Sequence, residues 1–302
     1  MNMELRKLKY EGGAHIGFQK YIYKTLSEAV KKHMFSVQFF LGSPYQINRA
    51  VIEDYDYRMC AKITNRFPIN IYTHFPYIAN LAGKSQKNSL AWTGNSKIDS
   101  YLRVVIRQIE YEMGCVAKLG GKGVVIHPGS YPDRKAGLDA IIKTLNKIKF
   151  GENYNLLLEN CAAEGNKLCK DFNEIAKVLD GAENKTNIGV CLDTAHVWGS
   201  GIYDISTIEG VDLMFSEFES VIGLDKLKLI HLNDSSVEFG SRKDRHAEIS
   251  TGCIWKDKVD VFYHLIDVAK NKNIPFILES DGSDIVFFLD VCNPCNQNYN
   301  CC

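Results

Sequence analysis

Residues 123–159 read GVVIHPGSYPDRKAGLDAIIKTLNKIKFGENYNLLLE, and this stretch contains one complete building unit of the fold. It begins and ends with short aliphatic runs, 123–127 and 155–159, which have the length and composition of buried strands. Between these runs, residues 134–148 repeat apolar side chains at helical spacing. A strand, a helix and a second strand in this order predict a parallel βαβ unit.

The same alternation extends in both directions along the chain. Strands are also predicted at residues 13–16, 36–41, 69–74, 188–193, 227–232 and 276–279, and helices at 23–33, 48–66, 99–119, 171–180, 207–221, 255–273 and 283–291. Eight parallel strands, each followed by a helix, make up a closed (β/α)₈ barrel. We therefore predict an α/β fold with one TIM barrel over residues 1–291, followed by a cysteine-rich tail over 292–302.

A doubly wound open sheet is the alternative architecture. Such a sheet normally carries a glycine-rich phosphate turn after its first strand, whereas Gly12 and Gly13 precede the body of the first predicted strand here. No Gly-, Ser- or Pro-rich linker interrupts the alternation of strands and helices. This continuity favours one domain over the two that a chain of 302 residues could form.

The composition is that of an ordinary globular protein. Hydrophobic residues make up 45% of the chain and charged residues 24%, and 36 basic residues balance 36 acidic ones. The longest apolar runs, such as residues 285–289, are far shorter than a membrane span, and no apolar run follows the N-terminal charges as in a signal peptide. We expect an intracellular protein, in cytoplasm or nucleus, that does not associate with membranes.

Ten cysteines raise the question of disulfide bonds. Six of them are scattered through predicted helices and strands in the manner of buried free thiols, which indicates a reducing compartment. The other four, Cys292, Cys295, Cys301 and Cys302, crowd the C-terminus. A C-x-x-C pair followed by two cysteines could hold zinc. Adjacent cysteines are awkward tetrahedral ligands, so an irregular tail is the competing interpretation.

The ends of the predicted strands carry the chemistry, because barrel active sites lie at the C-terminal face of the strands. Nine residues of metal-ligand type lie at strand ends or shortly after them: His74, His127, Glu159, Asp193, His196, His231, Asp244, His246 and Glu279. One such residue alone usually has a structural role, but burying all of them without a metal would cost several kcal/mol for each charged group. Imidazoles and carboxylates are ligands that zinc and related metals prefer. The set suits two or three metal ions with open positions.

A cluster of this kind favours phosphate chemistry. Two or three Zn²⁺ ions among four carboxylates leave a net charge of about zero to +2, which attracts anions to the barrel mouth. Paired metals can generate hydroxide at neutral pH and hold both the attacking and the leaving oxygen of a phosphoryl displacement. The cluster therefore suits in-line displacement at a phosphate group.

Ordered motifs along almost the whole chain carry a resemblance to a known family. They read GAHIG, VQFFLGSP, THFPY, IHPGS, LLLEN, CLDTAHVWGSGIYD, HLNDS, DRHAEI and ILES. This set resembles the endonuclease IV family of apurinic/apyrimidinic (AP) endonucleases, which act in DNA base excision repair. The resemblance implies a single barrel with three zinc ions that cleaves DNA on the 5′ side of an abasic site, leaving a 3′-hydroxyl and a 5′-deoxyribose phosphate.

The resemblance also implies a role for each ligand. The first zinc would be held by His74, His127 and Glu159, and the second by the bridging Glu159 with Asp193, His231 and Glu279. The third zinc would be held by His196, Asp244 and His246. A hydroxide between the first two metals would attack the phosphorus, with Glu159 or Glu279 as the catalytic residue that orients it.

Three further positions correspond to family residues that contact DNA. Tyr45 stands where family members insert a basic residue into the DNA stack, and Gln46 follows it. Tyr77 corresponds to a tyrosine that fills the gap at the abasic site, although loop packing is an equal alternative for it. The chain departs from the family at residues 18–23, which read FQKYIY where a Gly-Gly pair is common. The implied partner is double-stranded DNA that contains abasic sites, bound by a monomer.

Two rival functions share the metal-binding barrel. A sugar isomerase or epimerase also places Glu, Asp and His on divalent metals, but it has no clear use for the trio of His196, Asp244 and His246. A catalytically silent barrel would gain nothing from nine ligands. The neutral net charge is unusual for a DNA enzyme, but three zinc ions would add about +6 at the site. Basic residues on the same face could add phosphate contacts: Lys84, Lys87, Lys97, Arg134, Arg242, Lys243 and Arg245.

Overall fold

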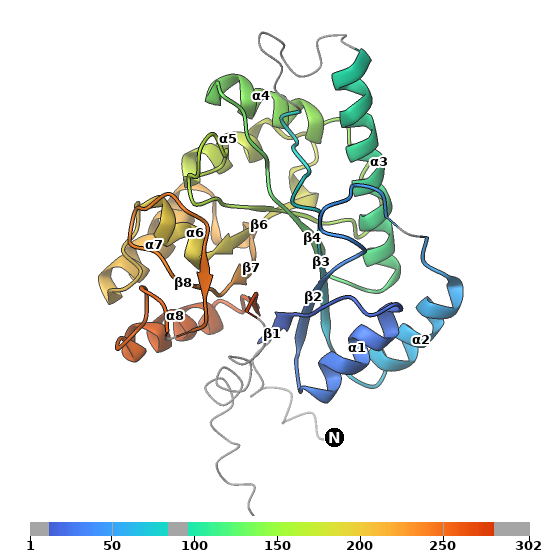
Figure 1. Cartoon of the computed structure of the whole chain (residues 1–302), viewed down its shortest axis with the longest axis horizontal. Coiled ribbons are helices and arrows are strands. Elements are labelled where there is room, and N and C mark those ends of the chain that lie inside the picture. Colours follow the sequence, from blue (N-terminus) through green and yellow to red (C-terminus); the bar gives the residue numbers. More distant parts are fainter. Residues whose placement is uncertain (1–11, 50, 84–95, 250, 281–302) are drawn as a thin grey trace, which may run out of the picture.

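Eight parallel strands close into a barrel in the computed structural model of the chain (Figure 1), which describes residues 12–49, 51–83, 96–249 and 251–280. The strands lie in the order β1-β10-β7-β6-β5-β4-β3-β2 around the ring. Their bounds are β1 Gly12–His15, β2 Ser36–Phe40, β3 Asn70–His74, β4 Gly123–Ile126, β5 Leu156–Glu159, β6 Ile188–Asp193, β7 Leu227–His231 and β10 Phe276–Leu278. The predicted TIM barrel is confirmed, and each strand end that differs from the prediction differs by one residue.

Helices surround the strands on the outside of the barrel (Figure 1). They are α1 Ile22–Lys31, α2 Asp54–Thr64, α3 Ser96–Lys118, α4 Arg134–Leu145, α5 Phe172–Gly181, α6 Thr194–Ser200, α7 Ile208–Val221 and α8 Val259–Asn271. Within the described ranges, no helix is long and apolar enough to cross a membrane. The predicted helix at 283–291, the cysteine-rich tail at 292–302, Lys84 and Lys87 lie outside the described residues.

Polar caps decide where several helices begin. The side chains of Asp133, Asp171 and Thr207 each accept a hydrogen bond from the backbone amide three residues further on, which satisfies a free N–H at the helix start. These helices begin within one residue of the prediction. The short helix α6 was not predicted, although Asp193 caps it and Gly201 ends it with a φ of 76°.

The second predicted helix begins at Asp54 rather than at residue 48. Arg49, which precedes it, is buried, and its guanidinium donates hydrogen bonds to the carbonyl oxygens of Leu41, Ser43 and Ile47. The amide of Ile52 donates to the hydroxyl of Tyr111 at 3.1 Å. These tertiary bonds replace helical ones, so the segment before α2 belongs to the loop that follows β2.

A small antiparallel hairpin interrupts the connection after β7. It consists of β8 (Asp234–Ser235) and β9 (His246–Ala247), and it pairs Ser235 with His246. The sequence pattern does not indicate these two-residue strands. The hairpin folds the long loop back over the barrel, and it thereby brings His246 to the barrel mouth.

Strand periodicity arranges the barrel interior in layers. The lower layer is an apolar cluster with one residue from each of six strands: Tyr72, Val125, Leu157, Cys191, Leu229 and Ile277. Side chains two residues apart on a strand point to the same side. The next layer toward the C-terminal ends therefore contains His74, His127, Glu159, Asp193, His231 and Glu279. The parallel register of β1 and β2 pairs His15 with Gln38, which completes the ring.

Candidate metal centre

Glu159 at the end of β5 lies between two sets of histidines. Its Oε2 atom is 3.1 Å from Nε2 of His74 and 3.0 Å from Nε2 of His127. Its Oε1 atom lies 3.2 Å from Nδ1 of His231. Each carboxylate oxygen thus faces a different group of potential ligands, which is the arrangement that a bridging carboxylate requires.

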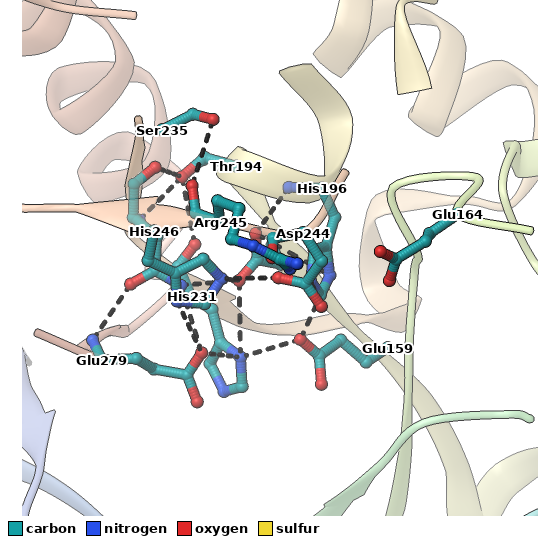
Figure 2. A network of polar contacts seen from close by, with 12 residues as sticks. Glu159, Glu164, Thr194, His196, His231, Ser235, Asp244, Arg245, His246 and Glu279 are labelled. Atoms are coloured by element: carbon teal, nitrogen blue, oxygen red, sulfur yellow. Dashed lines mark hydrogen bonds and ion pairs between the residues drawn. The ribbon is translucent and has the colours of Figure 1, made fainter. Parts of the chain in front are cut away.

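Glu159 belongs to two candidate metal-binding groups. The first contains His74, His127 and Glu159, and the second adds Asp193, His231 and Glu279 around the other side of Glu159. Figure 2 shows the imidazole of His231 between the carboxylates of Glu159 and Glu279. Nδ1 of His231 is 3.4 Å from Oε2 of Glu279. These two groups have the membership that the family resemblance implies for the first and second ions.

A third group lies beside the other two. It contains Asp193, His196 and His246. Asp244 contacts both of these imidazoles, because its Oδ2 is 3.0 Å from Nε2 of His196 and its Oδ1 is 3.4 Å from Nε2 of His246. All nine singled-out residues therefore lie in one connected cluster, part of which Figure 2 shows. Asp193 also lies near both histidines of the implied trio, 3.8 Å from His196 and 3.7 Å from His246.

Hydrogen bonds fix the orientation of three of the imidazoles. His74 Nδ1 lies 2.7 Å from the Phe75 carbonyl oxygen, and His196 Nδ1 lies 2.8 Å from the Asn160 carbonyl oxygen. His231 Nε2 lies 2.9 Å from the amide oxygen of Gln38. A ring nitrogen that donates in this way leaves the opposite nitrogen free to serve as a ligand. In all three rings that opposite nitrogen faces a carboxylate.

Two amides that the strand-end pattern does not single out hold the carboxylates in place. Asn233 Nδ2 donates to Asp193 at 2.6 Å and to Glu279 at 3.1 Å. Gln38 Nε2 donates to the other oxygen of Glu279 at 3.1 Å. Gln38 could have been found from sequence, because it is the one amide in the apolar strand run VQFF. His15 also borders the cluster, 3.8 Å from Glu279.

The cluster keeps its carboxylates ionised. Burial favours the neutral form of Glu279, yet the charge of His231 opposes it and the pKa of Glu279 is lowered to about 2. Glu159 is likewise buried, and His127 and His231 hold its pKa well below the usual value. Burial alone would lower the pKa of His196, but Asp193 and Asp244 raise it to about 10. The site therefore stabilises positive charge, which either protons or metal ions can supply.

The residues present fit metal ions. Nε2 of His196 and Nε2 of His246 are buried, and neither makes a hydrogen bond of good geometry within the described part of the chain. Buried nitrogens of this kind are costly unless they have a partner, and both face the carboxylate of Asp244. A donor set of imidazole nitrogens and carboxylate oxygens suits zinc and its neighbours rather than magnesium.

The two tyrosines implied to contact DNA lie at the edge of the first group. The Tyr77 ring centroid is 5.4 Å from that of His127, and 43% of the residue is exposed. Tyr45 is 70% exposed, with its ring centroid 6.4 Å from that of Tyr77. Gln46 is also exposed. Tyr77 both packs in its loop and keeps part of its surface open, so the two interpretations of this residue are compatible.

The loop that carries Tyr45 is anchored by a buried ion pair. Nε of Arg49 lies 4.0 Å from Oε2 of Glu112, and both side chains are fully buried. Burial raises the pKa of Glu112 to about 7, although the charge of Arg49 acts to lower it. The same guanidinium binds the loop carbonyls, so the position of Tyr45 depends on this pair.

Arg49→Met is expected to destabilise the protein more at about pH 8.5 than at about pH 6. Without Arg49 the pKa of Glu112 in the folded protein rises further. At the lower pH the buried carboxyl is then neutral and costs little. At the higher pH the unfolded chain releases this proton while the folded protein keeps it, so unfolding becomes more favourable. We expect a loss of about 3–5 kcal/mol at the higher pH, measured by urea unfolding. Adding Glu112→Met should remove most of the pH dependence. Equal losses at both pH values would show that Glu112 is not coupled to Arg49.

Comparisons with known proteins agree with this architecture. Residues 28–285 match the model of the Xylose isomerase-like TIM barrel family. A curated relative, "Probable endonuclease 4" of Staphylococcus aureus strain JH9, is 30% identical over 274 residues, which cover 89% of this chain and 86% of the relative.

Solved structures share the fold. Endonuclease IV from Thermus thermophilus superposes with a TM-score of 0.77 at 22% identity, covering 95% of this chain and 99% of that one. A D-tagatose 3-epimerase-like protein superposes less closely, with a TM-score of 0.66 at 14% identity and coverage of 95% and 98%. The sugar epimerases are therefore only distant relatives of this chain, similar to it in fold. The family model and the curated relative each span most of the sequence, so the chain belongs to the Xylose isomerase-like TIM barrel family and, within it, to the endonuclease IV family of nucleases.

Proposed function

We propose that this protein is a zinc-dependent AP endonuclease. It holds three Zn²⁺ ions and hydrolyses the phosphodiester on the 5′ side of an abasic site in duplex DNA, leaving a 3′-hydroxyl and a 5′-deoxyribose phosphate. The observation that carries the proposal is the position of Glu159, whose two oxygens face two metal-binding groups while a third group adjoins them. This geometry suits a displacement in which the attacking and leaving oxygens need separate stabilisation.

The proposed assignment of ligands follows the groups. His74, His127 and Glu159 hold the first ion, and Glu159, Asp193, His231 and Glu279 hold the second. His196, His246 and Asp244 hold the third, with Asp193 close enough to contribute. When bound, the zinc ions supply a nucleophile at neutral pH and positive charge for the leaving oxygen.

The protein's own groups position the reacting water. Glu159 and Glu279 are held as carboxylates in the same cluster, so either can orient the attacking water by accepting a hydrogen bond from it. Glu279 is held from two sides by Gln38 and Asn233. This fixed orientation avoids the cost of ordering the carboxylate during the reaction.

Metal analysis of the purified protein tests the proposal against its rivals. We expect about three zinc ions per chain. One or two ions would favour a sugar isomerase or epimerase of the same barrel class, and none would favour a catalytically silent barrel. The specific observation against the isomerase is the third group, because that chemistry has no clear use for His196, Asp244 and His246 together.

Tyr45→Ala and Tyr77→Ala are each expected to reduce the preference for abasic over intact duplex. An abasic nucleotide has lost its stacking and pairing, so turning it out of the helix is easier than for an intact one, and an aromatic ring can fill the space left behind. Each ring should contribute about 1–3 kcal/mol to the difference in binding free energy. Binding of both duplexes is measured at one salt concentration.

Tyr263→Ala is the matched control, because Tyr263 is 40% exposed on the outer helix α8. It should leave the ratio of the two affinities unchanged. Wild-type ratios for both Tyr45→Ala and Tyr77→Ala would assign these side chains to loop packing alone.

A further inference from the structure

A pocket of about 210 Å³ opens directly beside the metal centre. His127 and His196, which belong to the metal-binding groups, line it together with Tyr77. Lys167 and Ser130 also line it. Among the residues that line this pocket, Lys167 is the one lysine or arginine side chain.

The Lys167 ammonium is held at the border between this pocket and the third group. Nζ lies 3.2 Å from Oδ2 of Asp244 and 3.3 Å from Oε2 of Glu164. Figure 2 shows the Glu164 carboxylate directed toward Asp244. The Lys167 side chain keeps 30% of its surface exposed. It is thus placed by carboxylates but is still open to a ligand from the pocket.

The backbone around Lys167 is rigidly held. Lys167 pairs with Ser130 in an antiparallel bridge, and the amide of Leu168 donates to the Gly129 carbonyl at 2.9 Å. Arg134 Nη1 donates to the carbonyl of Lys167 at 3.1 Å. A side chain on such a preorganised loop loses little freedom when it binds a ligand.

Arg134, one of the basic residues that could add phosphate contacts, has a structural role in this loop. Its Nε and Nη2 each donate to one oxygen of Glu174 at 2.6 Å, and Glu174 in turn accepts hydrogen bonds from the amides of Cys169 and Lys170. The guanidinium is therefore engaged as a brace for the loop. These bonds hold the loop that carries Lys167, whose side chain lines the pocket.

We propose that Lys167 binds a backbone phosphate of the DNA strand that carries the lesion, at the point where that strand passes from Tyr77 to the third metal-binding group. This inference rests on the proposed function. Asp244 is a ligand of the third ion in that proposal, so its charge is shared with the metal and Lys167 retains donors for a phosphate oxygen. A lysine is a compact charge with three donors, which suits contact with a single phosphate.

Lys167→Gln tests the proposal on the zinc-loaded protein. Binding to the nicked product duplex, which carries all the phosphates but cannot be cut again at that linkage, is followed by fluorescence anisotropy from low to moderate salt. We expect about tenfold weaker binding at low salt. The slope of log K against log[salt] should fall in magnitude by about one, because one phosphate contact is lost. Lys167→Arg should recover most of the affinity and the slope.

Two other variants complete the design. Lys177 is the control, because it does not line the pocket and its Nζ forms an ion pair with Oδ1 of Asp139 at a distance of 2.9 Å. Lys177→Gln removes the same charge and should leave affinity and slope unchanged. Glu164→Gln removes the carboxylate that competes with phosphate for Lys167, and it should strengthen binding by about two- to threefold.

The outcomes separate this proposal from a purely structural role and from the proposed function. If Lys167 only braces Asp244, Lys167→Gln loses zinc while the salt slope stays at the wild-type value, and the proposal is wrong. An unchanged affinity and slope with full zinc content also overturns it. Failure of the wild-type protein to recognise an abasic duplex would instead contradict the proposed function, and this inference with it.

Discussion

Glu159→Gln is expected to lower kcat by at least about 10³-fold, which corresponds to about 4 kcal/mol of transition-state stabilisation. Glutamine keeps the size of the side chain but removes the charge that both histidine sets share. A neutral amide cannot bridge two cations as a carboxylate does. Binding of the abasic duplex should change by only a few-fold, because the exposed loops rather than Glu159 contact DNA in this account.

Single-turnover kinetics and anisotropy measure the two effects separately. Glu152→Gln is the control, because it makes the same chemical change at an exposed site before β5, at the opposite end of that strand. It should retain wild-type turnover. Near wild-type kcat for Glu159→Gln would instead assign Glu159 a purely structural role.

Removal of zinc is expected to abolish activity, but slowly. Activity should survive EDTA added to the assay for some time, since sites with several buried ligands release their ions slowly and magnesium is not required. Prolonged incubation with a zinc-selective chelator should eliminate it. Added Zn²⁺ should restore activity and Mg²⁺ should not, because imidazole ligands favour zinc over magnesium. Activity and bound zinc are measured in the same samples over time.

The time course distinguishes a resident metal from an exchangeable one. Loss of activity should follow loss of zinc. A strict requirement for added Mg²⁺ in a protein that contains no zinc would contradict the proposed cofactor.

The barrel and the centre of the site could be predicted from sequence because both depend on strand periodicity. Each buried strand is short and is followed by a helix, and this alternation predicts the closed ring. Inside the ring, the two-residue repeat places His74 above Tyr72 and Glu159 above Leu157. A polar residue at the end of an apolar strand therefore marks the layer in which ligands converge.

Features that depend on contacts between distant segments could not be read from sequence. The helical pattern before Asp54 is overridden by Arg49, whose partners include residues in a preceding loop and in α3. The hairpin that delivers His246 is too short to leave a periodic signal. In the sequence, Arg134 cannot be told from an exposed basic residue. Its ion pair with Glu174 follows from the packing of α4 against α5.

The measurement that tests the central claim most directly is incubation of the purified protein with a duplex that contains one abasic analogue. We expect a single cut on the 5′ side of the lesion, with a 3′-hydroxyl on one fragment and the abasic residue as a 5′-phosphate on the other. We expect no cut in the same duplex without the lesion. An abasic duplex that stays uncleaved after incubation with fully zinc-loaded protein would contradict the proposed function. Cleavage on the 3′ side alone would also contradict it.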